Sequence, residues 1–333
     1  MAETRISFNY LAKRVAVSVL VLWVLLTLLF LLLKAMPGDI TSLLLNPNLT
    51  AEDLQNLRRQ FGLNQPLWVQ YLKWVRNYAV FDFGYSLANK ESVTVMIARR
   101  LPRTVALFGT AFLLNYTLGV IAGIHFGWNR GGTTDKTGFV TGLTLYSVPF
   151  FWVAWMLLLV FSYQGFGVSW FPNAHMTSAF QSQFGLFELI VDVLWHMVLP
   201  AASLVVVGWA GAMLVMRTAM QEVVDKPYIE TARAKGLAPS TVKYKHGARN
   251  ALIPVATQGI IALVFILDGA VIVETVFSWP GMGALLVSAI VNRDFPTALA
   301  AFYMLGFLIV AARLMTDIAY TYLDPRIKFG EAQ

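Results

Sequence analysis

The chain has 333 residues, of which 57% are hydrophobic and only 13% are charged, whereas an average soluble domain has roughly 25% charged residues. This deficit favours a membrane protein over two soluble domains. The net charge of +7 also fits membrane topology better than nucleic-acid binding, because the basic residues lie between long apolar runs. Cysteine is absent, which excludes disulfides and thiolate metal sites, and the four histidines are far apart, so no metal site is expected.

The first predicted membrane helix is the apolar run of residues 15–33, which follows Lys13 and Arg14 and is long enough to cross a bilayer. A signal peptide is the alternative, but its apolar part is shorter and ends at a small-residue cleavage site. This run instead ends in the sequence KAMPGD. We therefore expect residues 1–36 to form a cytoplasmic N-terminus and a retained first membrane helix.

Residues 37–103 are predicted to be an extracytoplasmic segment that carries short amphipathic helices. Thr50 followed by Asp53 is a plausible helix start. Apolar residues recur at helical spacing in two sets, which are Leu54, Leu57 and Phe61, and then Trp68, Leu72 and Val75. The aromatic residues Trp68, Tyr71 and Trp74 could belong to helices packed on the outer face or could anchor the segment in the headgroup zone, and the sequence favours neither.

Five further apolar segments follow within residues 104–333, so the expected fold is all-α and polytopic, with about six membrane helices. These segments are residues 104–128, 139–163, 194–216, 251–277 and 298–322. Gly119, Gly123 and Gly127 form a repeated small-xxx-small pattern that allows close helix packing, within this chain or with a partner.

Basic residues in the short loops predict that both termini are cytoplasmic. In that orientation Lys and Arg gather in the inner segments, whereas the outer connection 164–193 has none and the outer connection 278–297 has only Arg293. The long outer segment 37–103 is basic in places, but long segments translocate largely regardless of charge.

The segment 217–254 is predicted to be a cytoplasmic loop built from two helices around a glycine. Pro227 suits a first helical turn, and Gly236 suits a helix end. Pro239 restarts the chain, and the residues after it run as a second helix into the membrane. The basic residues suit an acidic partner or anionic lipid. The positive-inside bias also explains this charge, but it does not explain the helix–glycine–helix layout.

Nucleotide-binding motifs are absent from the sequence. No Gly is followed by Lys, so a Walker phosphate loop is impossible, and the two G-x-G occurrences lack a third glycine. If ATP drives this protein, another chain must bind the ATP.

The loop resembles the EAA loop of ABC-importer permeases, in the dipeptide, oligopeptide and nickel subfamily. Glu230-Thr231-Ala232, Gly236 and Leu252-Ile253-Pro254 follow the motif, with Thr231 in place of its first Ala, and His246, Arg249 and Asn250 match the subfamily pattern. Further matches lie in order along the chain, at residues 36–39, 61–63, 66–67, 100–102, 147–149, 277–283, 293–294 and 324–326. The long outer segment after the first helix resembles the B-type permease of these systems.

The resemblance implies a type I ABC-importer permease fold in the cell (inner) membrane, with this chain forming half of the pore. It also implies a second homologous permease, two ATPase subunits that bind the ATP and Mg²⁺, and an extracytoplasmic substrate-binding protein. This chain would then hold no cofactor and no catalytic residue. Peptides are the expected cargo, and oligosaccharides or nickel are the alternative. A secondary transporter or a membrane-embedded enzyme would require an internal repeat or a catalytic constellation, and neither is found.

The resemblance also assigns roles to residues. Coupling to the ATPase is expected from Tyr228, Glu230, Thr231, Ala232, Ala234, Lys235, Gly236, Leu237, His246, Arg249, Asn250 and Pro254. Segment 277–283 should re-enter or cap the outer mouth, because Pro280 and two glycines break any helix; its candidate gate residues are Phe277, Trp279, Pro280, Gly281 and Gly283.

Asp268 is an acidic residue within the fifth predicted membrane helix, where a carboxylate is costly. It could line the translocation path, or it could pair with the second permease or with Arg313. Arg313 could equally pair with Asp317, which follows it by one helical turn.

Overall fold

The computed structural model describes residues 8–35, 64–162, 169–265 and 270–323. These residues are mainly helical, with one isolated antiparallel bridge between Tyr85 and Ser92, which confirms the expected all-α class. The α-helices are α1 (Phe8–Ala35), α4 (Leu67–Ala79), α5 (Val93–Trp128), α6 (Thr133–Tyr146), α7 (Phe150–Phe161), α8 (Leu186–Val224), α9 (Pro227–Ala234), α10 (Pro239–Thr241), α11 (Arg249–Phe265), α12 (Ala270–Val276), α13 (Met282–Val291) and α14 (Phe295–Leu323). A 3₁₀-helix, η1 (Gln181–Gln183), and a π-helical segment, η2 (Val242–Ala248), complete the set.

Four stretches of the described helices are long and apolar enough to cross a membrane, namely Leu11–Ala35, Val93–Trp128, Leu186–Val224 and Phe295–Ile318. Helices α6 and α7 make a fifth span if they are counted together, although the chain bends by 97° between them. The bend falls directly before α7, where Pro149 has no amide hydrogen to continue the helical pattern. The expected span 251–277 is divided into α11 and α12, and Asp268 lies between them, outside the described residues.

Two helices extend well beyond the predicted membrane segments. Helix α5 has 36 residues and begins at Val93 rather than Thr104, and α8 has 39 residues instead of the shorter span 194–216. At a rise of about 1.5 Å per residue, both are much longer than the roughly 30 Å apolar core of a bilayer. Hydropathy marks only the apolar centre of a helix, so the sequence-based boundaries fell short at the polar ends.

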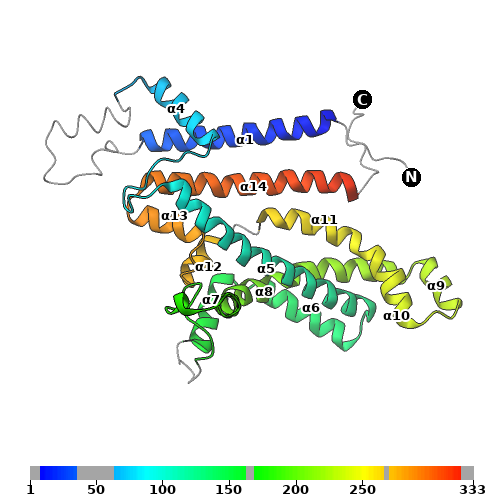
Figure 1. The fold of residues 1–333 in the computed structure, drawn as a ribbon. Helices are drawn as coiled ribbons and strands as arrows, with labels where there is room; N and C mark the ends of the chain where they lie inside the picture. Colours follow the sequence, from blue (N-terminus) through cyan, green and yellow to red (C-terminus); the bar gives the residue numbers. More distant parts are fainter. Residues whose placement is uncertain (1–7, 36–63, 163–168, 266–269, 324–333) are drawn as a thin grey trace.

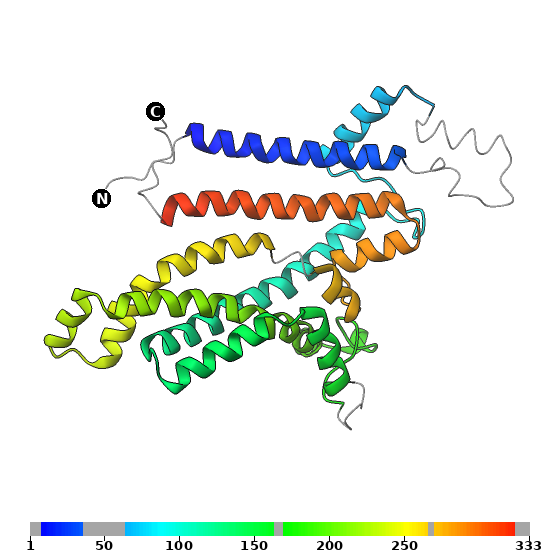
Figure 2. The same ribbon diagram turned by 180° about the vertical axis from the view of Figure 1, so that it is seen from behind.

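The helices form two groups (Figure 1). Helices α1 and α14 lie side by side along one edge, and α5, α6 and α8 pack together in the other group, as the reverse view also shows (Figure 2). Helices α9 and α10 lie at one end of the molecule, together with the first residues of α1 and the last residues of α14. Helices α4 and α13 lie at the opposite end.

The contact between α5 and α8 depends on the glycine pattern that the sequence indicated. A Cβ added to Gly119 or Gly127 would lie 2.6 Å from a backbone oxygen of α8, and one added to Gly123 would lie 2.5 Å from the Cβ of Met216. Real Cβ atoms do not approach other atoms so closely, so only glycine permits this packing. The pattern therefore serves packing within this chain.

Helix α4 packs on the outer part of α1. The Tyr71 hydroxyl lies 2.7 Å from Thr27 Oγ1, and the indole nitrogen of Trp74 donates to the Leu26 carbonyl. Burial of Tyr78 on the same face raises the pKa of its phenol, and the nearby Tyr303 adds to the effect. The predicted helix is confirmed, but its packing face contains Tyr71, Trp74 and Tyr78, whereas Trp68 is 66% exposed. The predicted set at Leu54, Leu57 and Phe61 lies outside the described residues.

Candidate functional site

The sequence-predicted coupling loop folds as a short helix with a glycine stop. Pro227 occupies the first turn of α9, and Gly236 follows its end with φ of 73°, a conformation that favours glycine. The amide of Gly236 donates to the Arg233 carbonyl at 2.9 Å, and the amide of Leu237 donates to the Ala232 carbonyl at 3.4 Å. These two hydrogen bonds form a Schellman motif, which satisfies the last carbonyls of the helix.

Helix α9 has a buried face and an exposed face. Ile229 and Ala232 are buried and pack in a cluster with Met220 of α8 and Val242 of η2. The other motif residues of this part of the loop are exposed, namely Tyr228, Glu230, Thr231, Ala234, Lys235, Gly236 and Leu237. Ala232 therefore packs α9 against its own chain, and the exposed residues beside it form a surface that a partner could contact.

The chain re-enters the helical bundle through η2. Pro239 starts α10 as predicted, but the second helix widens into a π-helix before it becomes α11 at Arg249. A Cβ on Gly247 would lie 3.3 Å from the Trp128 ring, and the guanidinium of Arg233 lies 5.4 Å from the centre of that ring. Trp128 at the end of α5 therefore contacts both halves of the loop.

The remaining coupling candidates lie on the second half of the loop, away from α9. His246 is half-buried in η2, and its carbonyl accepts a hydrogen bond from the Asn250 side chain at 3.0 Å. Arg249 and Asn250 are exposed at the start of α11, and Pro254 lies inside that helix. The structure thus divides the predicted coupling residues between the face of α9 and the η2–α11 junction.

A buried ion pair that no sequence pattern indicated holds the neighbouring turn between α5 and α6. Asp135 of α6 is 2% exposed and receives two hydrogen bonds from Arg217 of α8, at 2.5 and 3.0 Å. The amide of Gly131 donates to the same carboxylate at 3.0 Å, and the Arg217 guanidinium lies 4.8 Å from the centre of the Phe139 ring. The turn between α5 and α6 is therefore fixed to α8 close to the coupling loop.

We expect Asp135→Asn to lower the free energy of unfolding by about 3 kcal/mol, because it leaves the Arg217 charge uncompensated in a buried site. Asp225→Asn is the matched control, since Asp225 pairs with Arg130 at 3.0 Å while both side chains are more than half exposed. An exposed pair contributes about 1 kcal/mol or less. Thermal unfolding of the purified protein measures both effects, and equal shifts for the two variants would contradict a special role for the buried pair.

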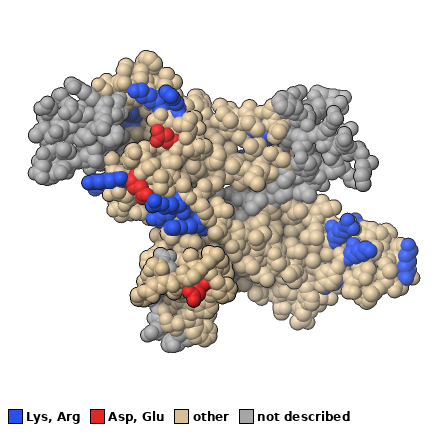
Figure 3. All heavy atoms as spheres, in the orientation of Figure 1, with Lys and Arg blue, Asp and Glu red and all other residues tan. Residues whose placement is uncertain are grey.

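Basic side chains gather at several places in Figure 3, among them the α9 end of the molecule, the surface over α4 and the amino-terminal part of α5. Lys226, Arg233 and Lys235 lie in or beside α9, and all three are exposed. This positive surface beside the open face of α9 suits a partner with acidic groups, or anionic lipid headgroups.

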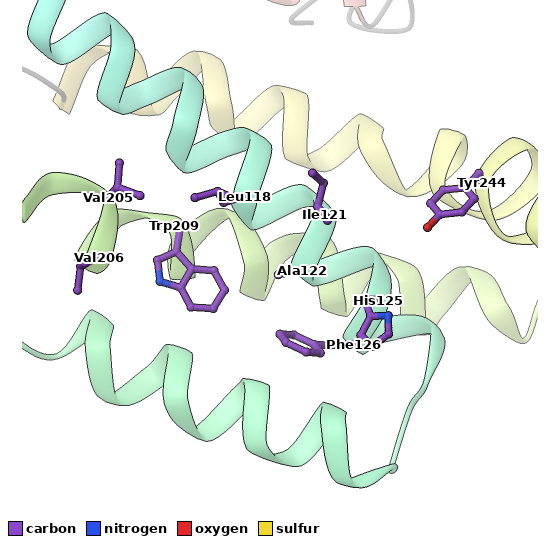
Figure 4. Close-up of a pocket in the computed structure, with 9 residues that line it drawn as sticks. All are labelled: Leu118, Ile121, Ala122, His125, Phe126, Val205, Val206, Trp209 and Tyr244. Atoms are coloured by element: carbon purple, nitrogen blue, oxygen red, sulfur yellow. The ribbon is translucent and has the colours of Figure 1, made fainter. Parts of the chain in front are cut away.

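A cavity of about 610 Å³ lies between α5 and α8 and adjoins the coupling loop. Its walls are mostly apolar, with Trp209 of α8 and Phe126 of α5 facing the same space (Figure 4). Tyr244 reaches the cavity from η2. A shift of η2 would therefore change the wall of this cavity as well as the position of α9.

The predicted helix break at residues 277–283 is confirmed. Helix α12 ends at Val276, Ser278 has a positive φ of 49°, and α13 begins at Met282. Phe277 and Trp279 are almost fully buried, and the Trp279 indole donates to the Arg103 carbonyl at 3.1 Å. The two aromatic gate candidates therefore anchor the segment against the bundle.

Glu274 organises this segment, and the sequence analysis missed it. Its carboxylate is completely buried and accepts hydrogen bonds from the amides of Gly283 and Ala284, at 2.7 and 3.1 Å. Thr104 of α5 donates to the carboxylate at 2.6 Å and accepts from the amide of Met282 at 2.7 Å. A Cβ on Gly281 would overlap the carboxylate, which explains the glycine there. One carboxylate thus joins α12, the start of α13 and α5.

Two further acidic residues, Asp294 and Asp317, each join elements that lie far apart in the sequence. Asp294 is buried and accepts hydrogen bonds from Ser86 Oγ at 2.5 Å and from Thr297 Oγ1 at 2.7 Å, so it joins the α4–α5 connection to the start of α14. Asp317, which the sequence offered as a partner for Arg313, lies 3.1 Å from Arg14 of α1. This ion pair joins α1 to α14, two helices that hydropathy alone could not place side by side.

Two family models match the chain. The family described as "Binding-protein-dependent transport system inner membrane component" matches residues 116–329, and the corresponding N-terminal model matches residues 7–108. The chain belongs to this family. This membership confirms the resemblance drawn from the sequence motifs, and it makes the chain a membrane component of a transport system that works with a binding protein.

Characterised and putative relatives align along nearly the whole chain. An oligopeptide transport system permease protein of Bacillus subtilis (strain 168) is 33% identical over 96% of this chain and 99% of that protein. A putative peptide transport system permease protein of Brucella abortus (strain 2308) is 35% identical over 95% of this chain and 98% of that protein. A crystal structure of an amino acid ABC transporter with histidines is a weaker match, with a TM-score of 0.46 and 15% identity over 68% of this chain and 94% of that one.

Proposed function

We propose that this chain is one of two permease subunits in an ATP-driven importer for di- and oligopeptides, and that it forms half of the translocation pore. The peptide cargo is supported by the two relatives described above, whose names refer to peptide or oligopeptide transport. The observation that carries the proposal is the coupling loop, in which α9 presents an exposed motif face while its other face is buried in the chain.

A conformational change of an ATPase would be transmitted to this chain through α9. The ATPase would bind the ATP and Mg²⁺ and contact the exposed face around Glu230 and Lys235, and this chain would supply no catalytic residue. Because Ile229 and Ala232 are packed against α8 and η2, α9 cannot move without displacing its neighbours. Movement of η2 passes directly into α11, since the two helices are continuous at Arg249.

The orientation that fits this proposal places α9 and both termini in the cytoplasm. The first residues of α1 and the last residues of α14 lie at the α9 end (Figure 1), where Lys226, Arg233 and Lys235 are exposed in or beside α9. Helices α4 and α13 would then lie on the outer side, together with segment 277–283. That segment would act as the outer gate, and its attachment to α12 would let it respond when the α11–α12 region moves.

Co-purification and reconstituted uptake test this function. From mild detergent, the chain should purify with a second permease and with ATPase subunits. Proteoliposomes that contain this complex should accumulate a labelled tripeptide only under two conditions. ATP must be on the side of the membrane that carries the ATPase subunits, and the binding protein must be on the other side. Purification without any ATPase, or uptake driven by an ion gradient without ATP, would refute the proposal.

A further inference from the structure

A second cavity, of about 530 Å³, lies beside the proposed outer gate. Its wall combines Arg103 of α5, Pro280 of the gate segment, and His175, Thr177 and Ser178 from the connection between α7 and α8. A volume of this size is within the range of about 300–1,000 Å³ that small-molecule sites occupy. Four of the side chains on its wall, those of Arg103, His175, Thr177 and Ser178, can form hydrogen bonds.

The backbone around the cavity is fixed to the gate. The amide of His175 donates to the Phe277 carbonyl at 3.0 Å, and the Arg103 carbonyl accepts the Trp279 indole hydrogen at 3.1 Å. His175 also has a positive φ of 70°, which is uncommon for a residue other than glycine. The backbone at Arg103 and at His175 is therefore held to the gate segment.

Three side chains on this wall can donate hydrogen bonds and have no side-chain partner among the residues that the structure describes. They are the Arg103 guanidinium, the His175 ring and the Thr177 hydroxyl. Of the residues on the wall, only Arg103 carries a formal charge at neutral pH when histidine is neutral. Unused donors around a single guanidinium match the acceptor oxygens of a carboxylate.

Asp192, an acidic residue close to Ser178 of the wall, already has partners of its own. The Asp192 carboxylate accepts hydrogen bonds from the amide and the hydroxyl of Ser178, at 2.7 and 2.6 Å, and it lies 3.4 Å from Nδ1 of His196. These contacts hold the Ser178 loop in place and satisfy the Asp192 charge locally. Among the arginines at the start of α5, Arg99 is different, because it pairs with Glu91 at 2.8 Å.

We infer that the Arg103–His175 cavity binds a carboxylate of the transported peptide as the peptide passes the outer gate. This inference rests on the proposed peptide-import function. A peptide always offers at least one such group at its C-terminus, unless that end is blocked. The cavity is recessed and adjoins Pro280 of the gate, which favours the transported molecule over the surface of the binding protein as the source of the carboxylate.

The test uses the complete importer in proteoliposomes, with the binding protein saturated by a labelled tripeptide that carries no charged side chain. The peptide is supplied either with a free C-terminal carboxylate or with a C-terminal amide. We expect Arg103→Gln to lower uptake of the free acid by about tenfold, the effect of losing one charged hydrogen bond. Arg103→Lys should recover part of this loss, and Arg103→Gln should import both peptide forms at similar, low rates.

Arg99→Gln is the matched control, because it removes an arginine from the same helix outside the cavity and should leave uptake unchanged. For each variant, we measure the concentration of binding protein that gives half-maximal uptake. Unchanged uptake in Arg103→Gln, an unchanged preference for the free acid, or weaker docking of the empty binding protein would each overturn the inference. Absence of peptide uptake by the wild-type complex would instead refute the proposed function itself, and the inference with it.

Discussion

Replacing Gly236 with valine is expected to leave the complex assembled but to lower peptide uptake per ATP hydrolysed by about tenfold, which corresponds to a loss of about 1.4 kcal/mol of coupling free energy. Gly236 has φ of 73°, and a Cβ added there would meet nothing within 4 Å. A valine side chain would therefore project into open space beside the exposed face of α9. Its bulk would press against the docked ATPase, whereas its own chain offers no steric obstacle.

Backbone strain is the competing explanation for any effect at Gly236, since a non-glycine residue in this conformation costs roughly 1–2 kcal/mol. Gly84 provides a matched control. It has φ of 77°, and a Cβ there also meets nothing within 4 Å, but it lies before α5 at the opposite end of the molecule. Gly84→Val should carry the same strain and keep uptake tightly coupled.

Uptake and phosphate release are measured in the same proteoliposomes, so that their ratio is independent of the amount of reconstituted protein. Gly236→Asn adds a further check, because asparagine tolerates the left-handed conformation better than valine does. It should therefore retain more coupling. If Gly84→Val lowered the ratio as much as Gly236→Val does, strain would explain both results and docking at α9 would lose its support.

The features of the coupling loop that the local sequence determines could be predicted. Pro227 and Gly236 fix the start and the end of α9 through the backbone conformations that these two residues adopt, and both positions are confirmed. The direction of each side chain could not be predicted in the same way. Ala232 matched the motif as well as Ala234 did, but only Ala232 is buried, because α8 and η2 cover that face of α9.

Long-range contacts explain what the sequence did not reveal. Hydropathy identified Asp268 as a costly acid in the fifth predicted span, yet the same argument applied to Glu274, and nothing local showed that Glu274 would find buried partners. Glu274 meets Thr104 across 170 positions of sequence, and Asp135 meets Arg217 across 82. Such pairs depend on how the helices pack, which periodicity within one helix does not determine. The bend between α6 and α7 is different, because Pro149 is a local signal for it, and the continuous apolar run 139–163 was nevertheless interpreted as one straight span.

Removing the Glu274 carboxylate is expected to have the largest effect on the outer gate. In Glu274→Ala, the amides of Gly283 and Ala284 and the hydroxyl of Thr104 all lose their buried acceptor. An unsatisfied buried donor costs about 1–3 kcal/mol, so we expect a loss of about 3 kcal/mol or more in the free energy of unfolding. Peptide uptake should fall with it, because the start of α13 loses its buried link to α12, and its link to α5 then depends on the hydrogen bonds of Trp279 and Met282 alone.

A readout of the gate itself separates this effect from general destabilisation. The chain has no cysteine, so Ser278→Cys creates a single site for a spin label on the exposed turn of the segment. The label should become more mobile in Glu274→Ala. Glu274→Gln should lie between that variant and the wild type, because its amide keeps one acceptor oxygen but places an NH₂ group against the backbone donors.

Glu188→Ala is the matched control for Glu274→Ala. Glu188 also accepts a backbone amide hydrogen at a helix start, from Gly185 at 2.9 Å, but its side chain is exposed and water can replace it. Its loss should cost about 1 kcal/mol and leave the label at position 278 unchanged. If Glu274→Ala destabilised the protein but left the label as rigid as in the wild type, the carboxylate would support folding without positioning the gate. Because Glu274 joins α12 to α13 and α5 at one point, we expect stability and gate position to be lost together.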